Sequence, residues 1–168
     1  MSQAESRSGL RAVRRSGETL QLVLNNDMAA IESGRREIRD WLDPAKLSPK
    51  VTNRWEVVFE EVVSNIVRHG FSPGGSHTIV VDAARTRDTI EFTFDDDGQF
   101  FDPLGAPEPA PLRSLETAPL GGLGVPLTRR LSTAMSYTRD PKDRPDEEAA
   151  EPGFAPRNRL RVTIATEA

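Results

Sequence analysis

The chain has 168 residues, which suits one domain, and its 36% hydrophobic and 29% charged residues indicate a soluble globular protein. It has no cysteines, which excludes disulfides, thiolate metal sites and thiol nucleophiles. Its net charge of −4 argues against direct nucleic-acid binding, and with no apolar run long enough for a membrane span or a secretory signal, we expect a cytoplasmic protein.

The N-terminal segment, residues 1–17, shows no clear apolar pattern. Its arginines are Arg7, Arg11, Arg14 and Arg15. We expect a flexible, solvated leader, and the functional alternative is an arm that touches an acidic partner. The folded domain is expected to span residues 18–168. It opens with a strand, because Leu20, Leu22 and Leu24 alternate on one face.

Two helices are predicted next. In residues 26–42, Asn26 or Asp27 can cap an amphipathic helix that Gly34 weakens. The stronger signal lies in residues 48–70, where Ser48 can cap the helix and Pro49 suits its first position. The apolar stripe of this second helix consists of Val51, Trp55, Val58, Val62 and Ile66.

The second half of the chain predicts strands, one helix and two irregular segments. Residues 77–85 and 88–96 indicate a hairpin, residues 135–140 and 159–166 indicate further strands, and a helix begins near residue 121. Proline-rich composition predicts a lid loop over about 102–120 and a flexible insert over about 140–157. This order predicts an α+β, two-layer sandwich with helices on one face.

Two polar stretches of the chain could carry chemistry. Glu61 and Asn65 lie four residues apart, so both side chains point to one helix face. An asparagine oxygen suits Mg²⁺, and a nearby glutamate could accept a proton. The second stretch, DDDGQFFD, ends a strand with Asp96 and Gly98. Its spacing does not fit a calcium loop, which leaves a ligand-binding carboxylate or a plain acidic turn.

A third stretch, LGGLGVPLTRRL, places three glycines before an amphipathic helix. These are Gly121, Gly122 and Gly124. Glycines at a helix N-terminus expose backbone N–H groups to which an anion can bind. The stretch is neither a P-loop nor a dinucleotide-binding motif, and a flexible hinge is the alternative reading.

The three stretches together, in this order, resemble the boxes of the GHKL ATPases, which bind ATP in a Bergerat fold with a mixed, mainly antiparallel sheet. FEEVVSNIVRHGF, DDDGQFFDP and GGLGVPLTRRL are similar to the anti-sigma-factor serine kinases of bacterial partner-switching systems, the RsbW and SpoIIAB group. The resemblance covers roughly residues 18–166. Phe100 occupies the position of the last glycine in the usual D-x-G-x-G box.

The resemblance implies a role for each matching residue. Glu61 matches the general base, and Asn65 matches the ligand of Mg²⁺. Asp96 matches the aspartate that accepts a hydrogen bond from the adenine amino group, with Gly98 beside it. The expected phosphate-binding residues are Gly121, Gly122, Leu123, Gly124 and Val125. Asp95 and Asp97 point the other way along the strand and are expected to be solvent-facing or structural.

The resemblance also implies partners. The chain is expected to use ATP and Mg²⁺ to phosphorylate a STAS-domain anti-anti-sigma factor, to bind a sigma factor or other regulatory target, and to form a homodimer. A histidine kinase would need a further helical hairpin that carries a phospho-accepting histidine. The alternative function is a binding module of the same fold that sequesters a regulatory protein without kinase activity.

Overall fold

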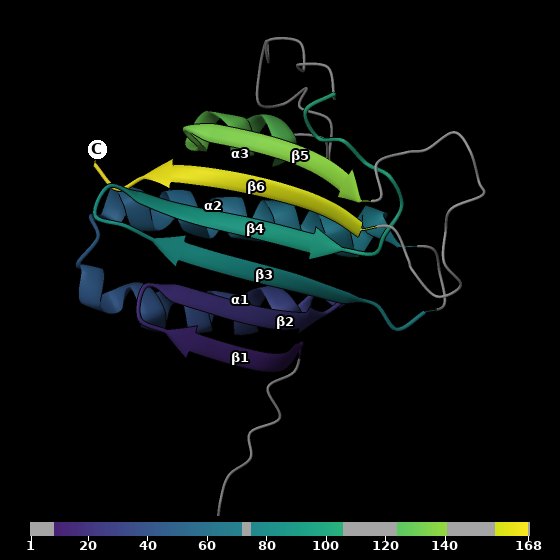
Figure 1. Cartoon of the computed structure of the whole chain (residues 1–168), viewed down its shortest axis with the longest axis horizontal. Coiled ribbons are helices and arrows are strands. Elements are labelled where there is room, and N and C mark those ends of the chain that lie inside the picture. Colours follow the sequence, from purple (N-terminus) through teal and green to yellow (C-terminus); the bar gives the residue numbers. More distant parts are fainter. Residues whose placement is uncertain (1–8, 72–74, 106–123, 141–156, 168) are drawn as a thin grey trace, which may run out of the picture.

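A six-stranded sheet, covered by helices on one face, forms the framework of the chain (Figure 1). The computed structural model describes residues 9–71, 75–105, 124–140 and 157–167. The strands lie in the order β1-β2-β3-β4-β6-β5, and each neighbouring pair is antiparallel. Their bounds are Leu10–Ser16 (β1), Thr19–Asn25 (β2), Thr78–Arg85 (β3), Thr89–Asp96 (β4), Ala134–Asp140 (β5) and Arg157–Ala165 (β6).

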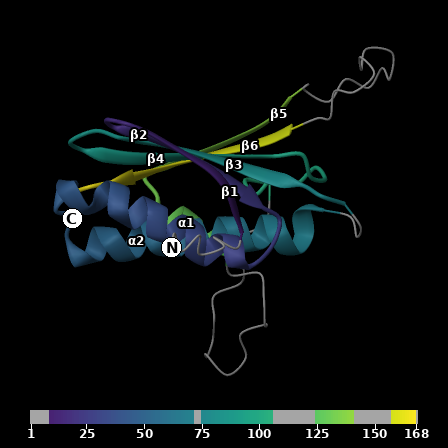
Figure 2. The same ribbon diagram turned by 90° about the horizontal axis from the view of Figure 1, so that it is seen from below.

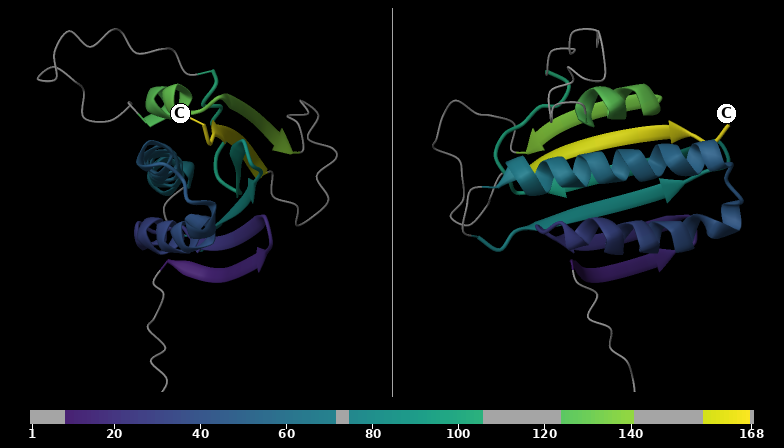
Figure 3. Two further views of the ribbon diagram at one scale, coloured as in Figure 1. Left: turned by 90° about the vertical axis from the view of Figure 1, so that its left-hand side faces the viewer. Right: turned by 180° about the vertical axis from the view of Figure 1, so that it is seen from behind.

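The helices lie together on one side of this sheet, as the side view in Figure 2 shows. Their bounds are Ala29–Leu42 (α1), Pro49–Asn65 (α2) and Gly124–Leu131 (α3), with a 3₁₀ turn at Asp43–Ala45 (η1) and a π-helical turn at Ile66–Gly70 (η2). The end-on view in Figure 3 separates the two layers. The predicted α+β sandwich is confirmed, although the sheet contains only antiparallel pairs in the described residues.

The core lies between the sheet and the two long helices. Leu20, Leu22 and Leu24 of β2 are buried, as their alternation predicts. The stripe on α2 is buried from Val51 to Val62, and Ile66 packs against its edge. The helix α2 packs against β6 and α1 packs against β2, so the two helices lie side by side along one face of the sheet (Figure 3).

The predicted cap of the second helix is confirmed, whereas α1 begins later than predicted, at Ala29, with Met28 at its N-cap position. The Ser48 hydroxyl accepts a hydrogen bond from the N–H of Val51 at 3.3 Å, and Pro49 is the first residue of α2. The Asp27 carboxylate accepts one from the N–H of Ala30 at 3.1 Å. None of the helices in the described ranges is both long enough and apolar enough to cross a bilayer.

The glycine at position 34, inside helix α1, has a packing role between the two long helices. A Cβ atom there would lie 3.0 Å from Cε1 of Phe59 and closer still to its Cζ. Both residues are buried where α1 crosses α2. The glycine, which weakens α1 as an isolated helix, therefore lets the two helices approach each other.

The structure corrects three predicted boundaries. Within the predicted leader, Leu10–Ser16 form the edge strand β1 and pair with β2, so this part of the leader is not flexible. The predicted insert is too long at both ends, because Asp140 belongs to β5 and Arg157 to β6. The long second helix ends its α-helical part at Asn65 and continues as the π-helical turn. Residues 106–120 of the predicted lid and the rest of the insert lie outside the described residues.

Candidate functional site

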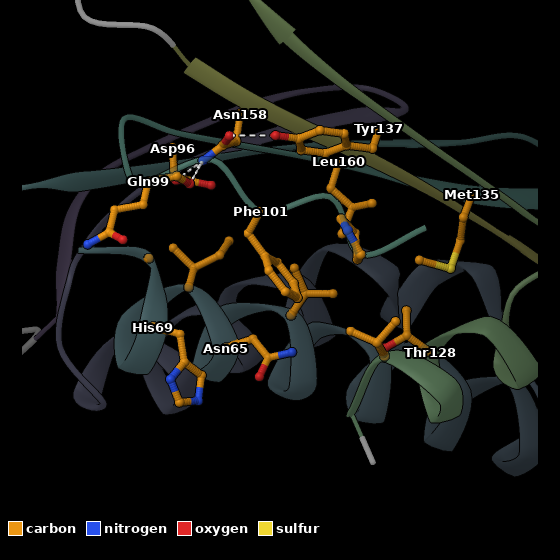
Figure 4. Close-up of a pocket in the computed structure, with 15 residues that line it drawn as sticks. Asn65, His69, Asp96, Gln99, Phe101, Thr128, Met135, Tyr137, Asn158 and Leu160 are labelled. Atoms are coloured by element: carbon orange, nitrogen blue, oxygen red, sulfur yellow. Dashed lines mark hydrogen bonds between the residues drawn. The ribbon is translucent and has the colours of Figure 1, made fainter. Parts of the chain in front are cut away.

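A cavity of about 120 Å³ opens where α2, its π-helical turn, α3 and the ends of β4, β5 and β6 meet (Figure 4). Three predicted site residues line it: Asn65, Asp96 and Val125. Its walls are mostly apolar, and they include Val62, Ile66, Phe101, Met135 and Leu160. Figure 4 shows Asp96 and Asn158 on the sheet side, opposite Asn65 and His69 on the helix side. The mostly apolar lining with a few polar side chains suits a small ligand with an apolar body and a few polar groups.

Asp96 is the buried carboxylate of this cavity, with only 5% of its surface exposed. Its Oδ1 atom accepts hydrogen bonds from the N–H of Gly98 and from Nδ2 of Asn158, both at 2.9 Å. Burial raises the pKa of Asp96, and these two hydrogen bonds act in the opposite direction. Both bonds from the described residues end on Oδ1, so Oδ2 is left to accept a hydrogen bond from a ligand.

Asn158 is held in turn by residues of β5. Its Oδ1 atom accepts hydrogen bonds from the Tyr137 hydroxyl at 2.7 Å and from Nη1 of Arg139 at 2.6 Å. Its Nδ2 atom also donates to the carbonyl oxygen of Gln99 at 2.8 Å. Burial raises the pKa of Tyr137, which keeps its hydroxyl protonated as a donor. The floor of the cavity is therefore a connected network rather than a single carboxylate.

Gly98 allows the end of β4 to meet the π-helical turn. A Cβ atom at this position would collide with the carbonyl oxygen of Gly70 and would lie 2.7 Å from Oδ1 of Asp96. The next residue, Gln99, donates its backbone N–H to the same Gly70 carbonyl at 2.6 Å. The D-x-G pattern thus has a packing reason here, because only glycine leaves room for both contacts.

Glu61 and Asn65 lie one helical turn apart on α2 and face the first residue of α3. A Cβ atom on Gly124 would lie 2.5 Å from Oε2 of Glu61 and 3.5 Å from Nδ2 of Asn65. Neither polar side chain hydrogen-bonds to another described residue, and both are only half-buried. Both side chains therefore lie beside the helix N-terminus, where the backbone dipole favours negative charge.

Two side chains of helix α3 make polar contacts beside the cavity, one within the helix and one to the chain after β4. The Thr128 hydroxyl donates to the carbonyl oxygen of Gly124 at 2.8 Å, and Thr128 lines the cavity. Arg129 reaches across from α3 and donates through Nη2 to the carbonyl oxygens of Pro103 at 2.9 Å and Leu104 at 2.6 Å. Gly121, Gly122 and Leu123, which were predicted to bind phosphate, lie outside the described residues.

The neighbouring aspartates have partners of their own. Asp95 is buried and pairs with Nε of Arg159 at 2.9 Å. Asp97 lies 3.2 Å from Nδ1 of His77. Both therefore make structural contacts, whereas Asp96 lines the cavity; that it faces a nucleobase stays a prediction. Phe100, in the place of the last glycine of the box, makes an edge-to-face contact with Tyr137 at a centroid distance of 5.9 Å.

The short motifs of the sequence do not indicate the residues that β5 and β6 contribute to the cavity. These are Met135, Tyr137, Asn158 and Leu160. Strand alternation groups Met135 with Tyr137 on one face, but Asn158 lies between the predicted insert, which ends at about residue 157, and the predicted strand, which begins at residue 159. Its place opposite Asp96 follows from the register of β4 with β6.

Asn65 offers an amide oxygen that could serve as one ligand of a metal ion. Across the described residues, no three His, Cys, Asp or Glu side chains are grouped so that they could hold a metal by themselves. Mg²⁺ that arrives with a nucleotide needs only one or two protein oxygens, because phosphates and waters supply the others. The half-buried amide of Asn65, beside the Glu61 carboxylate, meets that smaller requirement.

Comparison with known proteins gives two findings. Residues 24–145 match a family described as the histidine kinase-like ATPase domain. The chain is also similar to the serine/threonine-protein kinase BtrW of Bordetella bronchiseptica, with 38% identity over 80 residues. The matched segment covers 48% of this chain and 56% of that protein, so the chain spans about half the length of this relative.

Proposed function

The chain belongs to the histidine kinase-like ATPase domain family, and from this premise we propose that it is an ATP-dependent serine/threonine-protein kinase. The observation that carries the proposal is the meeting of two parts of one site. The buried carboxylate of Asp96 lies at one end of the apolar cavity, and Asn65 lines the same cavity beside Glu61 and Gly124. The first part suits a nucleobase, and the second suits its phosphates.

The adenine ring would occupy the cavity and donate its amino N–H to Oδ2 of Asp96. The phosphates would extend toward α3, where the N–H groups of Gly124 and Val125, and of the preceding Gly121, Gly122 and Leu123, would bind them. Asn65 would hold Mg²⁺, which neutralises phosphate charge when it is bound. These roles follow the family pattern residue by residue.

Glu61 is the proposed general base of phosphoryl transfer. It would take the proton from a serine or threonine hydroxyl of a partner protein while that oxygen forms a bond to the γ-phosphorus. The bond between this phosphorus and the β,γ-bridging oxygen breaks, and ADP leaves with the electron pair. Glu61 is supported in this role by its half-buried position beside Gly124, where no described residue competes for its carboxylate.

We further propose that the kinase acts as an anti-sigma regulatory factor in the cytoplasm. Its substrate would be a STAS-domain anti-anti-sigma factor, its second partner a sigma factor or another regulatory target, and its form a homodimer. The resemblance of the three boxes and the similarity to a protein named as a serine/threonine-protein kinase support this reading.

The test is calorimetric titration with ATP and ADP, with and without Mg²⁺, followed by transfer of labelled γ-phosphate to purified STAS-domain proteins of the source organism. We expect micromolar ATP binding that Mg²⁺ strengthens. Phosphate transfer should fall by about 100-fold or more in Glu61→Gln, since general-base catalysis contributes a factor of that order. ATP binding without transfer to any STAS protein would instead favour the nucleotide-dependent binding module.

A further inference from the structure

We propose that Asn158 is the positioning residue of the nucleobase site: its amide, locked by Tyr137 and Arg139, orients the Asp96 carboxylate so that Oδ2 faces the cavity as an acceptor. The inference rests on the proposed nucleotide site and adds a residue that none of the three sequence boxes contains. Asn158 lies on β6 and Asp96 on β4, directly opposite each other in the strand pairing. Figure 4 shows the chain of hydrogen bonds from Tyr137 through Asn158 to Asp96.

The orientation of the Asn158 amide is determined at both ends. A guanidinium group can only donate, so the amide atom 2.6 Å from Nη1 of Arg139 must be the oxygen. A backbone carbonyl can only accept, so the atom 2.8 Å from the Gln99 oxygen must be the nitrogen. The nitrogen that remains fixed in this way is the one that donates to Oδ1 of Asp96 at 2.9 Å.

This lock has a direct effect on the carboxylate. Oδ1 of Asp96 already accepts hydrogen bonds from Asn158 and from the N–H of Gly98, so the carboxylate group cannot rotate freely about its χ2 bond. If Asp96 were protonated, its neutral carboxyl group would be a weaker acceptor for these two N–H donors, so the two hydrogen bonds would stabilise it less. The amide therefore favours a carboxylate that accepts at Oδ2, which is the form that an exocyclic amino group requires.

Other titratable or charged groups around this pair come from each neighbouring element. They are Asp97 and Asp102 on the chain after β4, Arg157 on β6, Tyr137 and Arg139 on β5, and His69 on the π-helical turn. Arg157 lowers the pKa of Asp96 and Asp97 raises it, and each of these effects is weaker than that of the hydrogen bond from Asn158, which lowers it. The amide is therefore the principal polar contact that holds the carboxylate from outside its own loop.

The decisive substitution is Asn158→Asp, which keeps the shape of the side chain but replaces the donor nitrogen by an oxygen. That oxygen would face two acceptors, Asp96 and the Gln99 carbonyl. A new carboxyl there can donate again only when it is protonated. Relative to the wild-type chain at the same pH, ATP affinity should fall by about 30-fold or more near pH 8 and by only about fivefold near pH 5.5.

The matched control is Asn53→Asp, which makes the same chemical change on an exposed face of α2. It should leave ATP affinity unchanged at both pH values. Calorimetric titration with Mg-ATP measures the affinities, and thermal unfolding without nucleotide confirms that each variant is folded. Should Asn158→Asp not fold, Arg139→Met tests the lock from outside the cavity, with an expected loss of about fivefold.

The outcomes separate this inference from the proposed function. A wild-type chain that does not bind ATP would overturn both. A wild-type chain that binds ATP, with an Asn158→Asp variant equally impaired at both pH values or not impaired, would overturn the positioning role alone. Unchanged ATP affinity in Arg139→Met would do the same. A loss that grows with pH would support the role, because a merely structural defect has no reason to follow the charge of the new carboxyl.

Discussion

Replacing Gly34 by alanine sets two effects of opposite sign against each other in helix α1. An interior glycine costs a helix about 0.8–1.0 kcal/mol relative to alanine, so intrinsic propensity alone would make Gly34→Ala stabilising. The packing between the helices opposes this gain. The sign of the measured change in the free energy of unfolding therefore shows whether the close approach of α1 and α2 is rigid.

The structure lets us work out the opposing cost. The new Cβ atom would lie 3.0 Å from Cε1 of Phe59 and closer still to Cζ. Phe59 is fully buried, and its ring packs near that of Phe94 at a centroid distance of 6.3 Å. Overpacking of this kind costs about 1–3 kcal/mol. After the propensity gain, we expect a net loss of about 1 kcal/mol and a Tm lower by about 2–4 °C.

Urea unfolding of four proteins tests this prediction: the wild-type chain, Gly34→Ala, Phe59→Leu and the double variant. Phe59→Leu removes ring atoms next to Gly34 and is destabilising by itself. In that background Gly34→Ala should become neutral or stabilising, so the two substitutions should be coupled by about 1–2 kcal/mol. A Gly34→Ala variant that is about 1 kcal/mol more stable than the wild-type chain would refute the packing argument.

Three further predictions concern the site and the edge strand. Gly124→Ala should push the Glu61 carboxylate aside, so phosphate transfer should fall by about 100-fold. The ATP affinity, titrated on the same sample, should change little, and equal losses in transfer and affinity would contradict this prediction. Asp96→Asn should abolish ATP binding. It should also raise Tm without nucleotide, because burial raises the pKa of Asp96 and makes its ionisation unfavourable to the folded state. This gain should grow as pH rises from 3.8 through the raised folded-state pKa and stay constant above it; a Tm difference that shrinks over that range would oppose this. Arg15→Ala should cost about 1 kcal/mol in urea unfolding by removing the 2.7 Å ion pair with buried Glu37, whereas a loss near zero would show that the strand is not held by this pair.

The sequence predicts the elements that carry a strong local pattern. The stripe from Val51 to Val62 and the cap at Ser48 locate α2, and the alternation of leucines locates β2. It fails on β1, where the ladder shifts register between Leu10 and Ala12 and arginines occupy much of the strand. Such a strand is specified by pairing with β2 rather than by its own apolar pattern.

Some residues of the candidate site can be predicted from local sequence motifs, and others cannot. Glu61, Asn65 and Asp96 can be found from short motifs, because each motif is local in the chain. Asn158 cannot be found in this manner, since its role depends on pairing with a residue 62 positions earlier. Proline-rich sequence before it also favours a loop, and only the register of β6 against β4 places the amide beside the carboxylate.

Arg129 has a consequence for how this domain can vary in evolution. By holding the carbonyl groups of Pro103 and Leu104 from α3, it keeps the chain on either side of residues 106–123 within the reach of one side chain. When the two ends of a segment are held together by contacts outside it, doubling its length adds only about 0.6 kcal/mol of closure entropy. Insertions and deletions in this segment should therefore be tolerated at little cost to the fold.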